Sequence, residues 1–158
     1  MTIAGPLALA AAMVVYVTAQ RGPSGPELPA YSVSASGEQS MRGATEADAR
    51  LRLGKGRDAR FELVLRPATA PAEKVVAYPF TFVAPGSEPA PLEAAIEIAP
   101  EGAVRVTGSS RLLEGVHEIR IVVGAPAAIG KFDDAAARAR SGVTDARVRV
   151  LTVPIDRD

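Results

Sequence analysis

The segment from Gly124 to Phe132, GAPAAIGKF, is the nearest approach to a phosphate-binding loop in this sequence. Such a loop needs G-x-x-x-x-G-K-[ST] between a strand and a helix, because its N–H groups cradle phosphate and its hydroxyl holds magnesium. Here five residues separate Gly124 from Gly130, and Phe132 stands where the hydroxyl would be. We therefore expect an ordinary strand-to-helix loop and no bound nucleotide.

His117 is the one histidine, and it could act as a general base with Glu118 or Asp133 near it in the sequence. It opens the segment HEIRIVVG and shares the strand face of Ile119, which favours a structural position at the rim of a strand. A metal site around it would need carboxylate partners, and no D-x-D-x-D calcium loop is present. We expect no metal and no cofactor.

Ser109 and Ser110, in TGSSRLLEG, lack the G-x-S-x-G pattern of a nucleophile elbow and are expected in a turn. A pair of carboxylates could cleave a glycoside. The available glutamates are spread over different predicted strands and loops, as surface glutamates usually are: Glu93, Glu97, Glu101 and Glu114. No catalytic residue is predicted.

Arginine alternates with apolar residues in two segments, at Arg50 and Arg52 and at Arg147 and Arg149. If the two strands are neighbours, the four guanidinium groups could form a patch for an anionic polymer or for lipid headgroups. The favoured interpretation is solvated outer faces, on which the arginines pair across strands with glutamates. The glutamates expected in these pairs are Glu93, Glu97 and Glu118.

The composition of the 158-residue chain excludes several classes of function. Lys and Arg number 18, as do Asp and Glu, so the basic surplus of a nucleic-acid-binding protein is missing. There is no cysteine, which removes disulfides, thiolate nucleophiles and cysteine-based zinc sites. Because there is no Trp and aromatic residues are few, the core is expected to be built from Val, Leu, Ile and Ala.

From Tyr31 onward, apolar residues recur at every second position, which predicts strands. The segments are 31–36, 50–53, 59–67, 74–83, 92–100, 103–108, 117–124 and 146–155, with a hairpin turn at GKGRD (54–58) and a tight turn at PEG (100–102). Pro79 cannot donate to a ladder and predicts an edge or a bulge. About seven strands at even spacing predict a mainly β fold, an antiparallel immunoglobulin-like sandwich.

Alternation assigns faces to these strands. The predicted one-sided sets are Phe61, Leu63 and Leu65; Val76, Tyr78, Phe80 and Phe82; Leu92, Ala94, Ile96 and Ile98 opposite Glu93 and Glu97; Ile119, Ile121 and Val123; and Val148, Val150 and Thr152 opposite Arg147, Arg149 and Leu151. One short helix is predicted over Phe132 to Arg140, with acids in its first turn and arginines in its last. Gly142 would end it.

The N-terminal segment engages a membrane in our interpretation. Residues 3–19 carry no charge, and residues 1–20 in a helix would span about 30 Å, the thickness of the hydrocarbon layer. We expect an anchor or signal segment at 1–20, a Pro/Gly-rich linker at 21–29 and the β-domain at 30–158. An uncleaved anchor is slightly favoured over cleavage near Ala19, where small residues resemble a signal-peptidase site.

No Lys or Arg precedes the apolar run, although a signal peptide or a cytoplasmic flank would supply one. Either the amino terminus supplies the positive charge or a basic segment ahead of Met1 is missing from the sequence. We expect the C-terminal domain to lie outside the cytoplasm of a bacterium, attached to the inner membrane. Cleavage near Ala19 would instead release it to the periplasm or the medium.

An apolar helix followed by ELPAYSVSASGEQSMRG and then by LRLGKGRDARFELVLRPATA resembles single-pass bacterial proteins of the anti-sigma-factor-like kind. The resemblance covers most of residues 1–123. It implies a membrane helix and an all-β domain outside the cell, and it brings no catalytic residue. In that family a cytoplasmic zinc-binding domain with His and Cys ligands precedes the helix, and this sequence does not contain it.

These observations favour a non-enzymatic, membrane-tethered module that binds or senses a protein or polymer of the envelope through its sheet edges and loops. A structural subunit of an envelope membrane complex is the first alternative, since small residues in the apolar run would let helices approach closely. Those residues are Ala4, Gly5, Ala8, Ala11 and Ala12. A hydrolase that uses carboxylates or His117 is the second and less favoured one.

Overall fold

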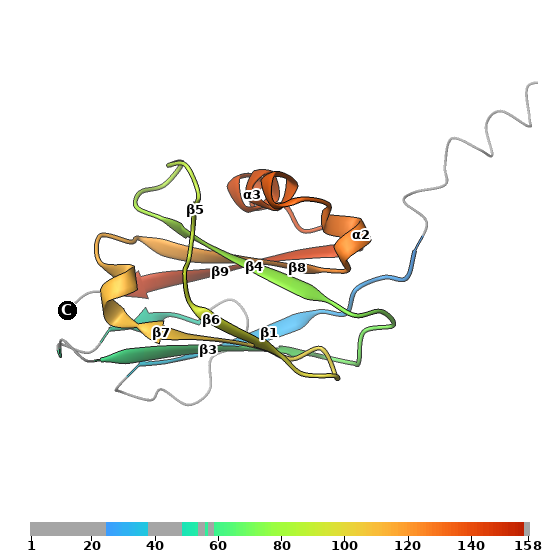
Figure 1. The fold of residues 1–158 in the computed structure, drawn as a ribbon, viewed down its shortest axis with the longest axis horizontal. Coiled ribbons are helices and arrows are strands. Elements are labelled where there is room, and N and C mark those ends of the chain that lie inside the picture. The colour runs from blue at the N-terminus through green and yellow to red at the C-terminus, as the bar shows by residue number, and fades with distance from the viewer. Residues whose placement is uncertain (1–24, 38–48, 54–55, 57–58, 157–158) are drawn as a thin grey trace, which may run out of the picture.

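The computed structural model describes residues 25–37, 49–53, 56 and 59–156 (Figure 1). The strands in these ranges are β1 (Tyr31–Ser36), β2 (Leu51–Arg52), β3 (Arg60–Pro67), β4 (Val76–Phe82), β5 (Ala90–Pro91), β6 (Ala95–Ile98), β7 (Val104–Ser109), β8 (Glu118–Gly124) and β9 (Val148–Asp156). The helices are the 3₁₀ turn η1 (Ser110–Leu113), α2 (Pro126–Ile129) and α3 (Phe132–Ser141). The mainly β prediction is confirmed, whereas the apolar segment 1–20 and most of the predicted turn at 54–58 lie outside the described residues.

The strands form two sheets that lie face to face (Figure 1). One sheet has the order β1-β3-β7-β6, and the other has the order β2-β9-β8-β4-β5. All the pairings are antiparallel except that of β2 with β9, which is parallel. Helix α3 lies over the outer face of the second sheet, with α2 beside it at one end.

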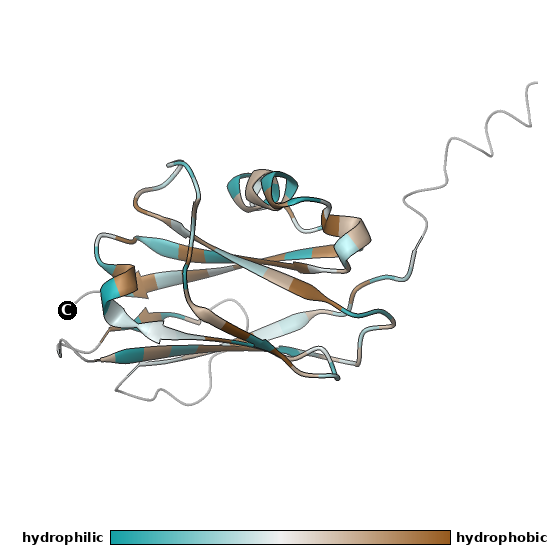
Figure 2. Ribbon diagram, viewed as in Figure 1, coloured by the Kyte–Doolittle hydropathy of each residue, from teal (hydrophilic) through white to brown (hydrophobic). Residues whose placement is uncertain are grey.

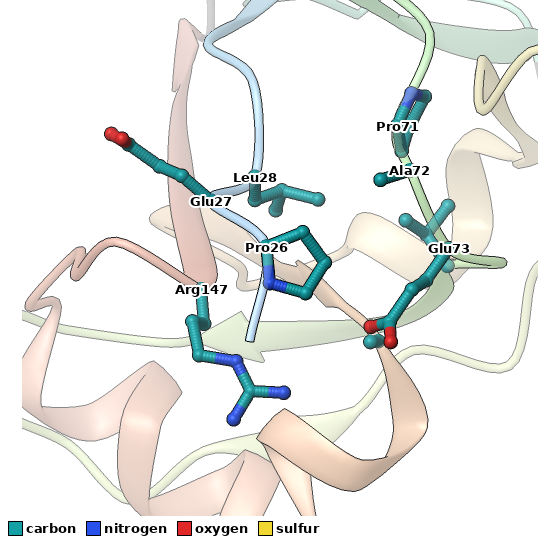
Figure 3. A pocket seen from close by; sticks show the side chains of 9 residues that line it. Pro26, Glu27, Leu28, Pro71, Ala72, Glu73 and Arg147 are labelled. Carbon is teal, nitrogen blue, oxygen red and sulfur yellow. The ribbon is translucent and has the colours of Figure 1, made fainter. Parts of the chain in front are cut away.

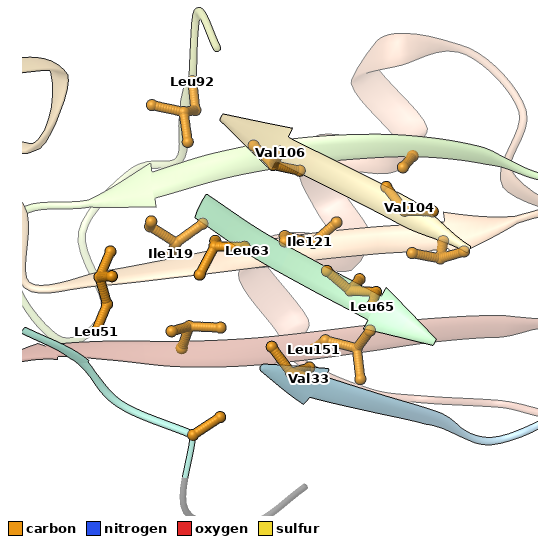
Figure 4. Close-up of a cluster of buried hydrophobic side chains, with 14 of the residues drawn as sticks. Val33, Leu51, Leu63, Leu65, Leu92, Val104, Val106, Ile119, Ile121 and Leu151 are labelled. Carbon is orange, nitrogen blue, oxygen red and sulfur yellow. The ribbon is translucent and has the colours of Figure 1, made fainter. Parts of the chain in front are cut away.

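The core between the sheets follows the predicted alternation. Leu63 and Leu65 of β3 are fully buried, as are Ile119 and Ile121 of β8, and the four belong to one cluster (Figure 4). Figure 2 shows apolar and hydrophilic residues alternating along β3, the signature of a strand with one face on a core. Burial of each such side chain contributes about 1.5–3 kcal/mol to the free energy of folding.

Strand β4 is covered on both faces. The predicted set Val76, Tyr78, Phe80 and Phe82 does share one face, but that face packs under α2 and α3 rather than between the sheets. Ala77, on the opposite face, belongs to the core between the sheets. The second core beneath the helices therefore takes the larger side chains of this strand.

Helix α3 confirms the predicted helix almost to the residue, and Gly142 caps it in the left-handed conformation, with φ at 66°. Arg120 of β8 holds its C-terminal end: Nη1 donates to the carbonyl oxygens of Ala139 (2.7 Å) and Arg140 (3.1 Å). A cation at this position complements the negative end of the helix dipole. The same side chain pairs with Glu118 at 2.7 Å and lies 4.5 Å from the ring centre of Phe82.

The prediction of an edge strand or a bulge at Pro79 is wrong, because β4 pairs with β8 without interruption and has the two-residue edge strand β5 on its other side. The carbonyl of Pro79 accepts the N–H of Leu92 at 3.0 Å, on the side of β5. The N and O of one residue in an antiparallel strand point the same way, so the nitrogen of Pro79 also faces that side. The β8 side of the ladder thus loses no hydrogen bond.

The predicted hairpin from 50–53 into 59–67 is wrong. Strand β2 pairs in parallel with β9, at Leu51↔Ile155, whereas β3 lies in the other sheet between β1 and β7. Leu51 is fully buried in the core between the sheets, and it can reach that core equally well from either sheet. Alternation places a side chain in the core but does not choose the sheet.

The predicted strand 92–100 is also wrong as a single strand. Residues 90–92 continue along β4, and the N–H of Ala94 then donates to the carbonyl of Leu92 at 2.9 Å. This three-residue turn transfers the chain to the other sheet, where β6 begins at Ala95. The predicted turn at 100–102 is confirmed: Gly102, with φ at 86°, closes the β6–β7 hairpin.

Strand β9 is apolar on both faces. Val148 and Val150 pack in the cluster beneath the helices, while Leu151, Val153 and Ile155 fill the core between the sheets. Leu151 does share the face of Arg149, as predicted, but that face turns inward. The predicted split between an apolar and a wet face is therefore wrong for this strand.

Asp145 organises the loop between α3 and β9. Its Oδ1 accepts the N–H groups of Arg147 (2.8 Å) and Val148 (2.9 Å), and its Oδ2 accepts from Arg138 at 2.5 Å. Burial by itself raises the pKa of this carboxyl, but these hydrogen bonds and the charge of Arg138 outweigh it, and the net pKa lies below the usual 3.8.

We expect Asp145→Ala to lower the free energy of unfolding by about 1 kcal/mol at pH 7, because two N–H groups lose their acceptor. Since the folded-state pKa is depressed, this stabilisation is present above pH 3.8 and is lost as the pH falls through the folded-state value. Urea unfolding of the full chain between pH 3 and pH 7 measures it. Asp145→Asn keeps an acceptor oxygen and should lose mainly the acid-dependent part; an unchanged pH dependence in this variant would contradict the assignment.

Candidate functional site

Strand β6 forms one edge of the first sheet. It pairs with β7 along its whole length, from Ala95↔Thr107 to Ile98↔Val104. Among the described residues, no strand pairs with its other side. An edge strand of this kind presents unpaired backbone groups to any chain that approaches it.

The alternation of the ladder determines which backbone groups are free. The N–H of Ala99 donates to the carbonyl of Ala103 at 2.8 Å, so Ala99 faces β7. The direction of the backbone N–H and C=O groups alternates from residue to residue along an antiparallel strand. Those of Glu97 and Ala95 therefore point towards β7 as well. The N–H and C=O groups of Ile96 and Ile98 point away from the sheet, which gives the edge two donors and two acceptors.

The side chains of Ile96 and Ile98 lie on the inner face of the sheet but at its margin. Directly opposite residues share a face, and their partners Val106 and Val104 are fully buried in the core. The two isoleucines are nevertheless 39% and 40% exposed. The core between the sheets is therefore open at β6, where further apolar side chains could extend it.

The prediction that Ile96 and Ile98 share a buried face with Leu92 and Ala94 is only partly right. Leu92 is buried and Ala94 packs against the core, but they precede the change of sheet. The isoleucines come after it, on a strand that has a neighbour on one side only. A half-covered strand cannot bury its inner face completely.

The outer face of this edge is acidic. Glu97 is 74% exposed and lies 3.7 Å from Arg105, which is itself 3.7 Å from Glu62 on the next strand. The sequence between Lys74 and Arg105 contains four acids and no Lys or Arg: Glu88, Glu93, Glu97 and Glu101. Glu88 pairs with Arg140 of α3, whereas the other three lie exposed on and beside β6.

The segment Gly124–Phe132 forms no phosphate cradle. Its central residues form α2, in which the N–H groups of Ala128 and Ile129 donate to the carbonyl of Ala125, and that of Gly130 donates to the carbonyl of Pro126. The N–H of Lys131 donates to Oδ2 of Asp134 at 2.8 Å. The ring centroids of Phe132 and Phe80 lie 5.4 Å apart. The predicted strand-to-helix loop is confirmed, but it is partly helical.

His117 is exposed at the start of β8, and its backbone pairs with Phe82 and Ile155. Glu118 is held by Arg120, and Asp133 lies on α3. The structure thus does not assemble a charge relay around this imidazole from the named partners. Among the described residues, no group of three or more His, Asp or Glu side chains could hold a metal ion.

Ser109 caps the 3₁₀ turn η1, where its Oγ accepts the N–H of Arg111 at 3.3 Å. Ser110 begins the same turn. Glu114 ends it, at the opposite end of the sheets from the β6–β7 turn that carries Glu101 (Figure 1). Glu93, Glu97 and Glu101 follow one another along β6 and its flanking turns, each about 13 Å of extended chain from the next.

The two arginine pairs do belong to neighbouring strands, but they form no common patch. Arg52 pairs in register with Asp156 at the end of β9, whereas Arg147 and Arg149 lie at its beginning. About seven residues of extended strand, roughly 20 Å, separate them. Arg50 forms an ion pair with Asp156 at 3.1 Å. Of the glutamates expected as partners, Glu97 pairs with Arg105, Glu118 pairs with Arg120, and Glu93 is exposed.

Arg149 fastens the N-terminal segment of the domain. Its guanidinium donates to the carbonyl oxygens of Leu28 (2.6 Å) and Pro29 (3.2 Å), and the N–H of Leu28 donates to Ala146. Beside this contact lies a small hollow with room for about one water molecule, lined by Pro26, Glu73 and Arg147 among others (Figure 3). The chain therefore enters the domain at a defined point, at the end where α2 and the β6–β7 turn lie.

None of the helices in the described ranges combines the length and hydrophobicity that crossing a membrane requires. No known protein family, no curated protein and no solved structure matches this chain. The fold and the edge define it as a mainly β protein of two facing sheets with an exposed, acidic edge strand.

Sequence reasoning missed this edge because alternation alone assigns Ile96 and Ile98 to a core. Two signals in the sequence point to it. Pro91 and Pro100 bracket a short strand, and 30 residues without a positive charge surround it.

We expect Ile96→Pro to leave the fold nearly unchanged, because the N–H that it removes points away from β7. Glu97→Pro removes a ladder donor and should lower the free energy of unfolding by about 1–3 kcal/mol more. Thermal unfolding followed by circular dichroism compares the two variants. Equal destabilisation by both would contradict the assigned orientation of the strand.

Proposed function

We propose that this chain is a membrane-tethered, extracytoplasmic β-sandwich of immunoglobulin-like type that binds another protein of the bacterial envelope. The single observation that carries this proposal is the edge of β6, with its outward-facing backbone groups and its two half-exposed isoleucines. Proteins with such edges commonly receive an extended segment of a partner as an additional strand.

The edge lacks two of the features that protect many edge strands against pairing. Inward-pointing charges and Pro within the strand normally block edge pairing. In β6 the inner face carries Ile96 and Ile98, and the flanking Pro91 and Pro100 lie outside the strand. An apolar margin of this kind favours a protein ligand over a polysaccharide, because it offers a partner apolar contacts in addition to main-chain hydrogen bonds.

The side chains in the described part of the chain favour binding over catalysis. Ser109, Glu114 and His117 all lie in the connection between β7 and β8, but the Oγ of Ser109 already accepts the N–H of Arg111, and Glu118, next to His117, is paired with Arg120. A catalytic set needs a nucleophile or base within hydrogen-bond reach of its partner.

The tether is supported by the uncharged run at residues 3–19 and by the way in which the domain begins. Arg149 and Ala146 hold Leu28 and Pro29 at the very start of the fold. Only the short Pro/Gly-rich linker 21–29 would then separate the apolar run from the β-domain. The β-domain would sit close to the membrane surface, where envelope partners meet it.

Photo-crosslinking in intact cells tests the binding role. A photoreactive amino acid at position 96 or 98 of the full chain should give an adduct with another protein, whereas the same group at position 143 should not. Val143 is a matched control because it is an exposed apolar residue in the loop after α3. Equal labelling at the two sites, or none at position 96, would refute the proposal.

Membrane fractionation tests the tether. The full chain should stay with the membrane pellet after alkaline carbonate washing. Leu9→Arg should release it or prevent its export, because a centrally placed arginine costs about 2.5–3.5 kcal/mol of insertion free energy. Ser24→Arg, outside the apolar run, is the control and should behave as the parent chain does.

A further inference from the structure

We propose that the occupant of the β6 edge is an extended protein segment in which apolar residues alternate with Lys or Arg. This inference rests on the proposed binding function and names the chemistry of the partner. The segment would add a fifth strand to the first sheet, beside β6. Its apolar side chains would face the core, and its basic side chains would face Glu97.

The backbone of β6 determines the pairing frame. Ile96 and Ile98 offer two N–H donors and two C=O acceptors, so an antiparallel segment can form four hydrogen bonds with them. Residues opposite the two isoleucines share their inner face and would extend the open margin of the core. The residue between them lies on the outer face, opposite Glu97.

The charge around the edge selects a basic residue at that outer position. Glu97 is 74% exposed, and Arg105 divides its charge between Glu97 and Glu62. Glu93 and Glu101 lie exposed at either end of β6, and no Lys or Arg occurs from residue 75 to residue 104. A cation on the incoming strand would therefore meet acids and no competing cation from this segment.

The other side of β6 already has a partner of this kind. Strand β7 places Val104 and Val106 opposite Ile98 and Ile96, and it places Arg105 opposite Glu97. The proposed segment repeats this apolar–basic–apolar arrangement on the free side. The acid would then lie between two cations.

A second copy of the chain fits the edge less well. The register that uses all four outward-facing groups pairs Ile96 with Ile98 of the other copy and places the two Glu97 side chains directly opposite each other. Like charges in this position are destabilising. Glu97 thus protects the edge against self-association while it favours a basic partner.

Peptide titration of the full chain in detergent micelles tests this inference. The probes are a short peptide in which valine alternates with arginine and a matched peptide with glutamate in place of arginine. The arginine peptide should bind the more tightly, with amide shifts at Ile96 and Ile98 in NMR spectra, and Glu97→Lys should reverse the preference. Each charge pair should contribute about a two- to fivefold change in Kd.

Glu62→Lys is the matched control. It makes the same charge change on the same face, but it lies three strand spacings, about 14 Å, from the incoming strand, beyond the screening length of physiological salt. It should leave the preference intact. Ile96→Pro should abolish the binding of both peptides.

Equal binding of the two peptides, or no binding of the arginine peptide, overturns the inference. If crosslinks at position 96 persist in that case, the binding function stands with a partner of different chemistry. Crosslinks that join position 96 to position 96 of a second copy overturn it in favour of self-association. The absence of any crosslink at position 96 removes the binding function itself.

Discussion

The packing of β3 against β8 is the contact on which the rest of this structure depends. These strands lie inside their respective sheets, and Leu63 and Leu65 lie with Ile119 and Ile121 in the core between the sheets, all four fully buried. No disulfide joins the sheets, because the chain contains no cysteine. The two sheets are therefore held together by apolar contact, which is non-directional and tolerates different strand orders. That tolerance allows β2 to join the second sheet rather than to form a hairpin with β3.

The second sheet cannot leave its outer face in water, because β4, β8 and β9 carry apolar side chains on both faces. Helix α3 covers that face with its alanines, and Arg120 ties the C-terminal end of the helix to the sheet. The first sheet needs no such cover, since its outer face carries Glu62, Arg105 and Glu97. The outer face of the second sheet is thus covered by a helix, whereas the first sheet presents a polar outer face up to its exposed edge at β6.

The change of sheet between β5 and β6 creates this margin. The turn at Leu92–Ala94 ends the pairing with β4 after two residues and starts a strand that only β7 borders. The chain therefore forms the edge strand β5 of the second sheet and, directly after this turn, the edge strand β6 of the first. The binding role that we propose is a consequence of this crossing, since a single continuous strand in one sheet would have presented no such combination of free backbone and apolar side chains.

The sequence by itself determined most of the strand segments and, for β3 and β8, the side chains that face the core, because period-two alternation and turn chemistry are local properties. The segments of β1, β3, β7 and β8, the helix from Phe132 and the turn at Gly102 all agree with it. Only the tertiary structure decided the sheet that each strand joins, the helix-covered face of β4 and the inward turn of Arg149. It also decided that Ile96 and Ile98 lie at an open edge. The physical reason is that a strand's alternation records whether a face is covered but not what covers it, and the neighbours of β6 come from segments far away in the chain.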